Sequence, residues 1–388
     1  MKFRRIIAIL LALVMVFALA ACGGGDTAKD NNSGSDNSNN DGGSSSGGSY
    51  YIGINTWGSG VPVLDMFGDA KEYTLKTLGH TVNRMSDDFS ADKELQNAQN
   101  MIAAQVDGIV YEGSGITTVP QMAELCANAG IPFALDVFIG DDADLAKLAE
   151  TNEFYCGAID SDMVADGAAI AEIAYANGCR NACMIGGNMG DNNMDARSKG
   201  FSDKFKELGG TILYEARCTD NSECQAKASD MLAANPQTDC VYAFAGDYIP
   251  GSLAAAENLG MDEIQFYVSC VDEGTAQYIK EGKVVAGNDG ISLASYISCT
   301  LVLNYLAGHK IVDENGKAPR LSTHPFPVNQ DNVDDYCKVF FTDGYSPFTK
   351  EMLEALLYTS NPDVSYQDYV DLIANINLDY MLESNGLK

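Results

Sequence analysis

Basic residues are scarce in this sequence. Its 388 residues include 24 lysines and arginines against 54 aspartates and glutamates, so the formal net charge is −30 at pH 7. A surface with this charge repels phosphate backbones and anionic lipid headgroups. The composition therefore argues against nucleic-acid binding, and we interpret the acidic surface as a source of solubility.

The apolar run near the N-terminus is too short to cross a bilayer. It extends from Ile6 to Ala21, about 16 residues, whereas a membrane-spanning helix needs roughly 20. Arg4 and Arg5 precede the run, and small residues end it. A positive flank, a short apolar stretch and small residues before a cleavage site are typical of a secretory signal. Residues 1–21 are therefore predicted to be a signal peptide.

The signal ends at a cysteine that is followed by a polar segment. Leu19-Ala20-Ala21-Cys22 resembles the bacterial lipobox, which implies cleavage before Cys22 and attachment of a lipid to its thiol. The alternative is an ordinary secretory leader in which this cysteine is incidental. Residues 22–49 are rich in glycine, serine, asparagine and aspartate, so we expect a flexible tether on a lipidated Cys22.

Signatures of common enzymes and metal sites are also missing. The sequence has three histidines, no G-x-S-x-G motif, and a "GGNMG" stretch without dinucleotide-binding spacing. "DENGK" lacks the alternating carboxylates of a calcium loop. We therefore predict no enzymatic activity, no cofactor and no metal.

Cysteine is common, with 11 residues, but only Cys22 lies in a motif. Most of the others occur in apolar or helical segments without paired metal-type spacing, and we interpret them as small buried hydrophobic residues. Cys218 and Cys224 either close a local disulfide or remain thiols, and the sequence does not decide between these alternatives.

From Tyr50 onward, short β-rich runs alternate with runs of helical length. The first series contains YYIGIN, HTVNRM, DGIVYE and IPFALDV, and the second contains FYCGAID, NACMIGG, GTILYEA, DCVYAFA, IQFYVSC and KVVAGN. Such alternation predicts an α/β fold with parallel sheets. Two series predict two doubly wound lobes joined by a hinge. The residues after these lobes predict two amphipathic helices linked by "SNPDVS".

These patterns give the following expected organisation. The first lobe comprises residues 50–158 and 291–322, the second comprises residues 159–290 and 323–341, and a helical extension spans 342–388.

Polar and aromatic side chains occur at or just after the ends of the predicted strands. They are Asn55, Trp57, Glu112, Asp136, Asn188, Asp247, Asp272 and Asp289. Ligands of open parallel sheets bind beyond the carboxyl ends of the strands. Any single aspartate at such a place is equally well explained as a helix cap.

Residues from Tyr50 to about Phe341 resemble a type I periplasmic binding protein of the ribose and galactose class. The likeness rests on ADKELQNAQNMIAAQVDGIVY, NAGIPFALDV, DARSKGF and CVDEGTAQYIKEGKVVAGN, in this order. It implies a receptor of an ABC importer, with Asp136, Arg197 and Asp272 as polar sugar contacts. The sequence departs from the family pattern at Val137 and Gly246, which weakens an assignment to ribose itself.

The expected ligand is a neutral sugar, held by carboxylates, an arginine and aromatic rings. The predicted ligand-binding residues are Asn55, Trp57, Asp136, Phe138, Arg197, Asp247, Asp272 and Asp289. We expect a monomer that is lipid-anchored outside the cytoplasmic membrane and delivers the sugar to a permease. The alternatives are a sensor, a receptor for a nucleoside or a signalling furanose, and, less well supported, a secreted hydrolase.

Overall fold

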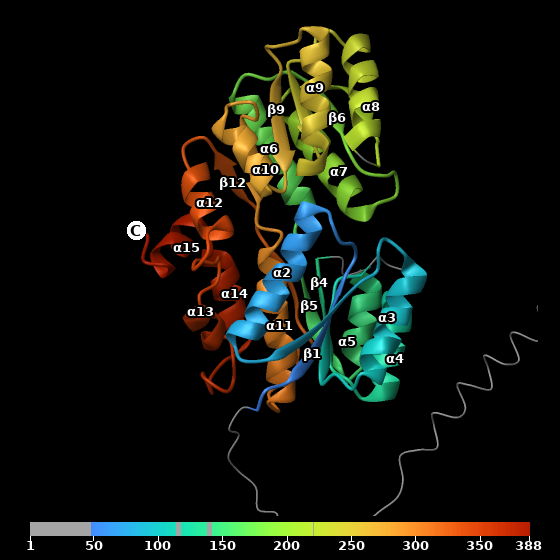
Figure 1. The fold of residues 1–388 in the computed structure, drawn as a ribbon, viewed down its shortest axis with the longest axis vertical. Coiled ribbons are helices and arrows are strands. Elements are labelled where there is room, and N and C mark those ends of the chain that lie inside the picture. Colours follow the sequence, from blue (N-terminus) through green and yellow to red (C-terminus); the bar gives the residue numbers. More distant parts are fainter. Residues whose placement is uncertain (1–47, 114–117, 138–141, 220) are drawn as a thin grey trace, which may run out of the picture. The chain divides into compact units, whose positions relative to one another are not determined.

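The computed structural model describes residues 48–113, 118–137, 142–219 and 221–388. Two six-stranded sheets with helices packed on them form this part of the chain (Figure 1). No helix in these ranges is long and apolar enough to span a membrane. Cys22, Phe138, the predicted signal peptide and nearly all of the predicted tether lie outside the described residues.

The first sheet, sheet A, is parallel throughout, with strand order β11-β5-β4-β3-β1-β2. Its strands are β1 (Tyr51–Thr56), β2 (Thr81–Ser86), β3 (Gly108–Tyr111), β4 (Phe133–Asp136), β5 (Tyr155–Ser161) and β11 (Arg320–Thr323). Its helices are α2 (Pro62–Thr77), α3 (Ala91–Ala103), α4 (Val119–Ala129), α5 (Asp142–Thr151) and α11 (Leu293–Leu306). We call these elements lobe A.

The second sheet, sheet B, has strand order β12-β10-β9-β8-β6-β7, and only β12 is antiparallel to its neighbour. Its strands are β6 (Asn181–Ile185), β7 (Thr211–Ala216), β8 (Cys240–Ala243), β9 (Gln265–Ser269), β10 (Ala286–Asp289) and β12 (Phe326–Asn329). Its helices are α6 (Met163–Ala176), α7 (Asn192–Glu207), α8 (Asn221–Ala234), α9 (Ile249–Leu259), α10 (Glu273–Lys280) and α12 (Val333–Phe341), with a short 3-10 turn, η1 (Gly246–Tyr248). We call these elements lobe B.

The predicted α/β architecture with two doubly wound lobes is confirmed, but one strand belongs to the other sheet. We assigned FYCGAID to the start of the second series, whereas β5, which covers most of it, pairs with β4 and β11 in sheet A. Periodicity identifies a strand but does not tell which edge it joins, because both series share the same pattern. The lobe boundaries proposed from the sequence stay a prediction.

The C-terminal extension is helical, as predicted, but it contains three short helices instead of two longer ones. They are α13 (Lys350–Ala355), α14 (Tyr366–Asn375) and α15 (Leu378–Ser384). The second predicted helix is interrupted at Ile376, which is extended, and the Asn377 side chain then caps α15 by accepting the Tyr380 N–H. An Asn with this geometry starts a new helix and does not continue the old one.

This extension covers helix α11, which is buried on nearly all sides. The Tyr369 hydroxyl lies 2.7 Å from Thr300 Oγ1, and Asn304 Nδ2 donates to the Leu356 carbonyl at 2.8 Å. Helix α13 packs against α2, while α15 packs against α12. The extension therefore contacts elements of both lobes and shields the apolar surface of α11 from water.

Candidate functional site

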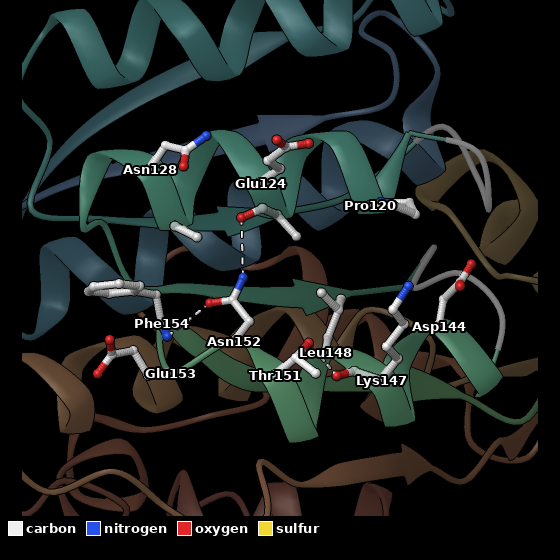
Figure 2. A pocket seen from close by; sticks show the side chains of 12 residues that line it. Pro120, Glu124, Asn128, Asp144, Lys147, Leu148, Thr151, Asn152, Glu153 and Phe154 are labelled. Atoms are coloured by element: carbon white, nitrogen blue, oxygen red, sulfur yellow. Dashed lines mark hydrogen bonds between the residues drawn. The ribbon is translucent and has the colours of Figure 1, made fainter.

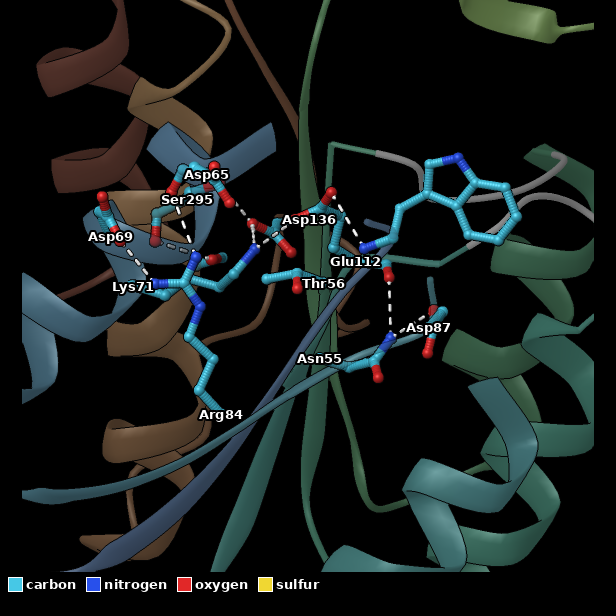
Figure 3. A network of polar contacts seen from close by, with 12 residues as sticks. Asn55, Thr56, Asp65, Asp69, Lys71, Arg84, Asp87, Glu112, Asp136 and Ser295 are labelled. Atoms are coloured by element: carbon cyan, nitrogen blue, oxygen red, sulfur yellow. Dashed lines mark hydrogen bonds and ion pairs between the residues drawn. The ribbon is translucent and has the colours of Figure 1, made fainter. Parts of the chain in front are cut away.

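A buried lysine holds two acidic side chains together at the carboxyl end of sheet A. Lys71 Nζ lies 2.9 Å from Glu112 Oε2 and 2.8 Å from Asp136 Oδ2 (Figure 3). The Ser295 hydroxyl also donates to Asp136 Oδ2, at 2.5 Å. All four residues are fully buried and come from α2, β4, α11 and the loop after β3.

The charges of this group depend on one another. Burial alone would lower the pKa of Lys71, but attraction by Asp136 and Glu112 outweighs it and raises that pKa above its usual value. Burial raises the pKa of Glu112, and the lysine charge only partly offsets this effect. Asp136 Oδ1 is buried and has no hydrogen-bond partner among the described residues, so one oxygen of this carboxylate remains available as an acceptor.

Asn55 holds the carboxyl end of sheet A in place through hydrogen bonds within lobe A. Its Nδ2 donates to Asp87 Oδ2 at 2.8 Å and to the Glu112 carbonyl at 3.1 Å, and its Oδ1 accepts from Asn97. Burial raises the pKa of Asp87 to about 7. The fully buried Asn55, predicted to contact ligand, thus fixes the loop after β3 through bonds within the lobe.

Trp57 lies at the end of β1 and is half-buried. Its backbone N–H donates to Glu112 Oε1 at 3.3 Å, and its ring meets Phe89 edge to face at 5.7 Å. Phe89 is 51% exposed and has a positive φ of 63°. Two adjoining aromatic rings with accessible surface are the type of group that stacks on a flat apolar ligand face.

In lobe B, each nitrogen of the Arg197 guanidinium contacts a protein group. Its Nε donates to Asp166 Oδ2 at 2.8 Å, one terminal nitrogen donates to the Phe244 carbonyl at 3.0 Å, and the other lies 2.8 Å from Cys270 Sγ. Only 3% of its side chain is exposed. Phe244 is itself fully buried. Arg197 therefore joins α7, α6 and the ends of β8 and β9.

Asp289 ends β10 beside this arginine network. The Tyr336 hydroxyl lies 2.7 Å from Asp289 Oδ2 and 2.6 Å from the Val271 carbonyl. Burial raises the pKa of Asp289 to about 7, although the bond from Tyr336 works against the shift. Its Oδ1 has no partner among the described residues.

Asp247 and Asp272 form a second acidic pair in lobe B. Asp272 caps α10, with Oδ1 accepting the Thr275 N–H at 2.6 Å, so the helix-cap explanation holds for this residue. Burial and, to a smaller extent, repulsion from Asp272 raise the pKa of Asp247 to about 6. A Cβ at Gly246 would lie only 2.4 Å from Thr275 Oγ1, which explains physically why a side chain is missing there.

An apolar cluster joins the strand ends of the two lobes. It contains Val63, Phe67, Val137, Met163, Cys270 and Ile291. Val137 follows Asp136, and Cys270 contacts Arg197. Both Val137 and Cys270 have a φ of 58°, a left-handed conformation that is strained for residues with a side chain and is concentrated at functional sites.

Six of the eight predicted residues thus fall into three polar groups. Asn55 and Asp136 belong to the lobe A network, Asp289 lies near the Arg197–Asp166 pair of lobe B, and Asp247 lies near Asp272. The apolar cluster lies next to the first two groups.

The sequence interpretation missed Lys71, Asp166, Cys270 and Tyr336. For Lys71 a signal exists, because it lies four residues after Phe67 and four before Leu75, on the buried stripe of α2. A charged lysine in an apolar stripe indicates a buried anion nearby. For Asp166 the sequence gives no such signal. Helix α6 is apolar on most sides, so the sequence does not show which of its faces is buried.

Surface grooves occur elsewhere, away from these groups. One of about 420 Å³ lies between α4 and α5, where Asn152 Nδ2 donates to the Ala123 carbonyl at 3.2 Å (Figure 2). Another of about 550 Å³ adjoins α9 and α10. None of the predicted ligand-binding residues that the structure describes lines either groove.

Residues 52–310 match the family described as periplasmic binding protein domain. No curated protein matches the sequence significantly. Among solved structures, the chain is similar to an ABC transporter periplasmic solute binding protein from Actinobacillus succinogenes with bound D-allose, at 20% identity and a TM-score of 0.66, covering 74% of this chain and 100% of that one.

Two further solved structures show the same fold. A solute binding protein from Bacillus halodurans with bound myo-inositol has 18% identity and a TM-score of 0.62, covering 76% of this chain and 99% of that one. The arabinose-transporter component from Shewanella, bound to L-arabinofuranose, has 17% identity and a TM-score of 0.65, covering 74% and 94%.

Replacing the buried lysine tests the lobe A network. Lys71→Met leaves Glu112 and Asp136 buried together without a cation, so the free energy of unfolding at pH 7 should fall by about 3–5 kcal/mol. Urea unfolding measures this loss. Lys93→Met is the control, because the exposed Lys93–Asp88 pair should contribute no more than about 1 kcal/mol. Similar losses in both variants would contradict the assigned role of Lys71.

The raised pKa of Asp289 predicts a pH dependence of stability. The folded state binds this proton more tightly than the unfolded chain, whose pKa is about 3.9. The stabilising contribution is therefore complete below about pH 4 and is lost as pH rises through about 7. An asparagine does not titrate, so Asp289→Asn does not lose this contribution. The free energy of unfolding of the variant minus that of wild type should therefore rise by about 2–4 kcal/mol from pH 4 to pH 8.

Unfolding free energies of the wild type and the variant at both pH values measure this gain. The exposed Asp343→Asn serves as the control and should follow wild type. A constant difference between Asp289→Asn and wild type at all pH values would rule out titration of Asp289 in this range.

Proposed function

The chain belongs to the periplasmic binding protein domain family, and from this premise we propose that it captures a sugar or related polyol outside the cytoplasmic membrane and delivers it to an ABC permease. Solved structures of the same fold hold allose, inositol and arabinofuranose, which are uncharged molecules with many hydroxyl groups. These ligands support the proposed class of ligand for this chain.

The unpartnered acceptor oxygens at the strand ends carry this proposal. Asp136 Oδ1 in lobe A, and Asp247 Oδ1 and Asp289 Oδ1 in lobe B, are buried and have no partner among the described residues. A buried acceptor without a donor costs about 1–3 kcal/mol. Ligand hydroxyl groups are donors that remove this cost, and bonds to a charged acceptor are stronger than neutral ones.

Each predicted residue receives a role from its contacts. Asp136, Asp247, Asp272 and Asp289 accept ligand hydroxyl groups, while Trp57 covers an apolar face of the ring. Arg197 and Asn55 position the strand ends through the bonds described above. Phe138 follows Val137 and remains a predicted contact outside the described residues.

Ligand capture proceeds by closure of the two lobes. The apolar cluster contains residues of both lobes, so contact between the lobes buries apolar surface next to the polar groups. A ligand that bonds to acids of both lobes favours the closed state by its differential affinity. The permease then recognises the closed receptor, and no covalent bond of the ligand changes, in keeping with a family of binding proteins.

The proposal includes the membrane anchor. A lipid on Cys22 and the tether of residues 22–49 would keep a monomeric receptor at the outer face of the membrane, near its permease. Two acyl chains give stable anchoring, whereas a single chain does not.

A ligand screen tests the proposed activity. Monosaccharides, polyols and nucleosides are each added to the protein, and the melting temperature is recorded. A true ligand at 100 times its Kd should stabilise the folded state by about 2.7 kcal/mol. No stabilisation by any sugar or polyol would contradict the proposal, and stabilisation by nucleosides alone would change the ligand class.

Calorimetry with the ligand so identified then tests the residues. Asp247→Asn, which keeps the size of the side chain, should weaken binding about tenfold or more without lowering the melting temperature of the ligand-free protein. Asp262→Asn, an exposed change on the same lobe, is the matched control. Unchanged affinity in Asp247→Asn would remove this residue from the site.

The anchor is tested separately. Cys22→Ser should abolish lipid attachment and move the protein from the detergent phase to the aqueous phase in phase partitioning, because the acyl chains are lost. Substitution of Ser33, in the same tether, should leave partitioning unchanged. A Cys22→Ser protein that still partitions with detergent would show that the anchor is elsewhere.

A further inference from the structure

Three metal-ligating side chains meet at the edge of sheet B where its strands begin. Cys179 lies in the connection between α6 and β6, Asp239 precedes β8, and Cys240 is the first residue of β8. The two sulfur atoms and a carboxylate oxygen of Asp239 all lie within 4.8 Å of one another. This is the opposite end of the strands from the acids assigned to sugar binding.

The spacing of the three side chains leaves room for a tetrahedral metal ion. Zinc–sulfur and zinc–oxygen bonds of about 2.3 and 2.1 Å place two ligand atoms of a tetrahedron about 3.6 Å apart. Gln265 Oε1, at the start of β9, lies 3.6 Å from Cys179 Sγ. This amide oxygen is thus close enough to Cys179 to serve as a fourth ligand or as the partner of a bound water.

The surrounding groups orient these ligands. Asp239 Oδ2 accepts the Arg180 N–H at 2.8 Å, and Oδ1 accepts the Asn181 N–H at 3.0 Å, which fixes the carboxylate while Oδ1 keeps a lone pair. The Tyr267 hydroxyl donates to Gln265 Oε1 at 2.6 Å and accepts from Asn177. Outer bonds of this kind hold the ligands of metal sites in place.

We propose that Cys179, Cys240 and Asp239 bind one thiophilic divalent cation of the zinc class, with Gln265 or a water as the fourth ligand. Binding converts both thiols to thiolates and releases two protons. Cys179 and Cys240 are buried thiols in the structure. The sequence predicts no metal site here, because the two cysteines are far apart along the chain.

The bound cation would have a structural role. It links the α6–β6 connection to the first residues of β8 and β9, which are neighbours in sheet B. Without a cation both cysteines remain neutral thiols beside the Asp239 carboxylate. When the metal binds, its two positive charges compensate the two thiolate charges that form. Because the unfolded chain does not preform the site, metal binding should stabilise lobe B.

Cobalt titration of the full chain tests the proposal. The protein is purified in detergent under reducing conditions, stripped with a chelator and titrated with Co²⁺, whose thiolate bonds absorb in the near ultraviolet. We expect one Co²⁺ per chain, displacement by Zn²⁺, and a higher melting temperature with Zn²⁺ than after chelation. Cys179→Ser/Cys240→Ser should lose the absorption, whereas Cys126→Ser/Cys299→Ser, with two buried cysteines of lobe A replaced, should retain it.

A second variant keeps the test informative if the double serine variant fails to fold. Asp239→Asn retains acceptors for the backbone N–H groups and should weaken Zn²⁺ binding about tenfold or more. Absence of Co²⁺ binding by wild type, unchanged affinity in Asp239→Asn, or a Cys179–Cys240 disulfide in protein purified with Zn²⁺ would each overturn the proposal.

Discussion

The ion pairs of Lys71 with Glu112 and Asp136 are the interaction on which the candidate site of lobe A depends. They join α2 to β4 and to the loop after β3 at the end where a ligand would bind. Removing charges from water is costly, and this cost is repaid only by close geometry and further hydrogen bonds. Ser295 and the Trp57 backbone N–H supply such bonds. The lysine therefore allows two acids to remain adjacent without water.

Lobe B uses the same arrangement with a different cation. Arg197 donates to Asp166 Oδ2, as Lys71 donates to Asp136 Oδ2. In both carboxylates Oδ1 has no partner among the described residues. Each internal cation thus fixes an acid through one oxygen and leaves the other as an acceptor. The candidate sites of both lobes thus present buried acceptor oxygens, which would suit a ligand that brings many donors and forms no covalent bond.

Much of the fold follows from local patterns, because strands and helices of a parallel α/β protein have distinct periods. The alternating runs from Tyr50 onward predict both sheets, and the helix-cap alternative holds for Asp272. The assignment of β5 to sheet A and the break at Ile376 were not predictable in this way. Strand order depends on which edges meet in space, and one extended residue decides whether a helix continues.

The sequence by itself determined the two-lobed α/β class, the acidic character of the protein and the strand-end positions of Asp136, Asp247 and Asp289. These properties depend on composition and on periods of a few residues. Only the tertiary structure decided that Lys71 pairs with Asp136, that Arg197 bonds inward to Asp166, and that Cys179 meets Cys240. These contacts join distant segments, and their partners become neighbours only when the strands are ordered in the sheets.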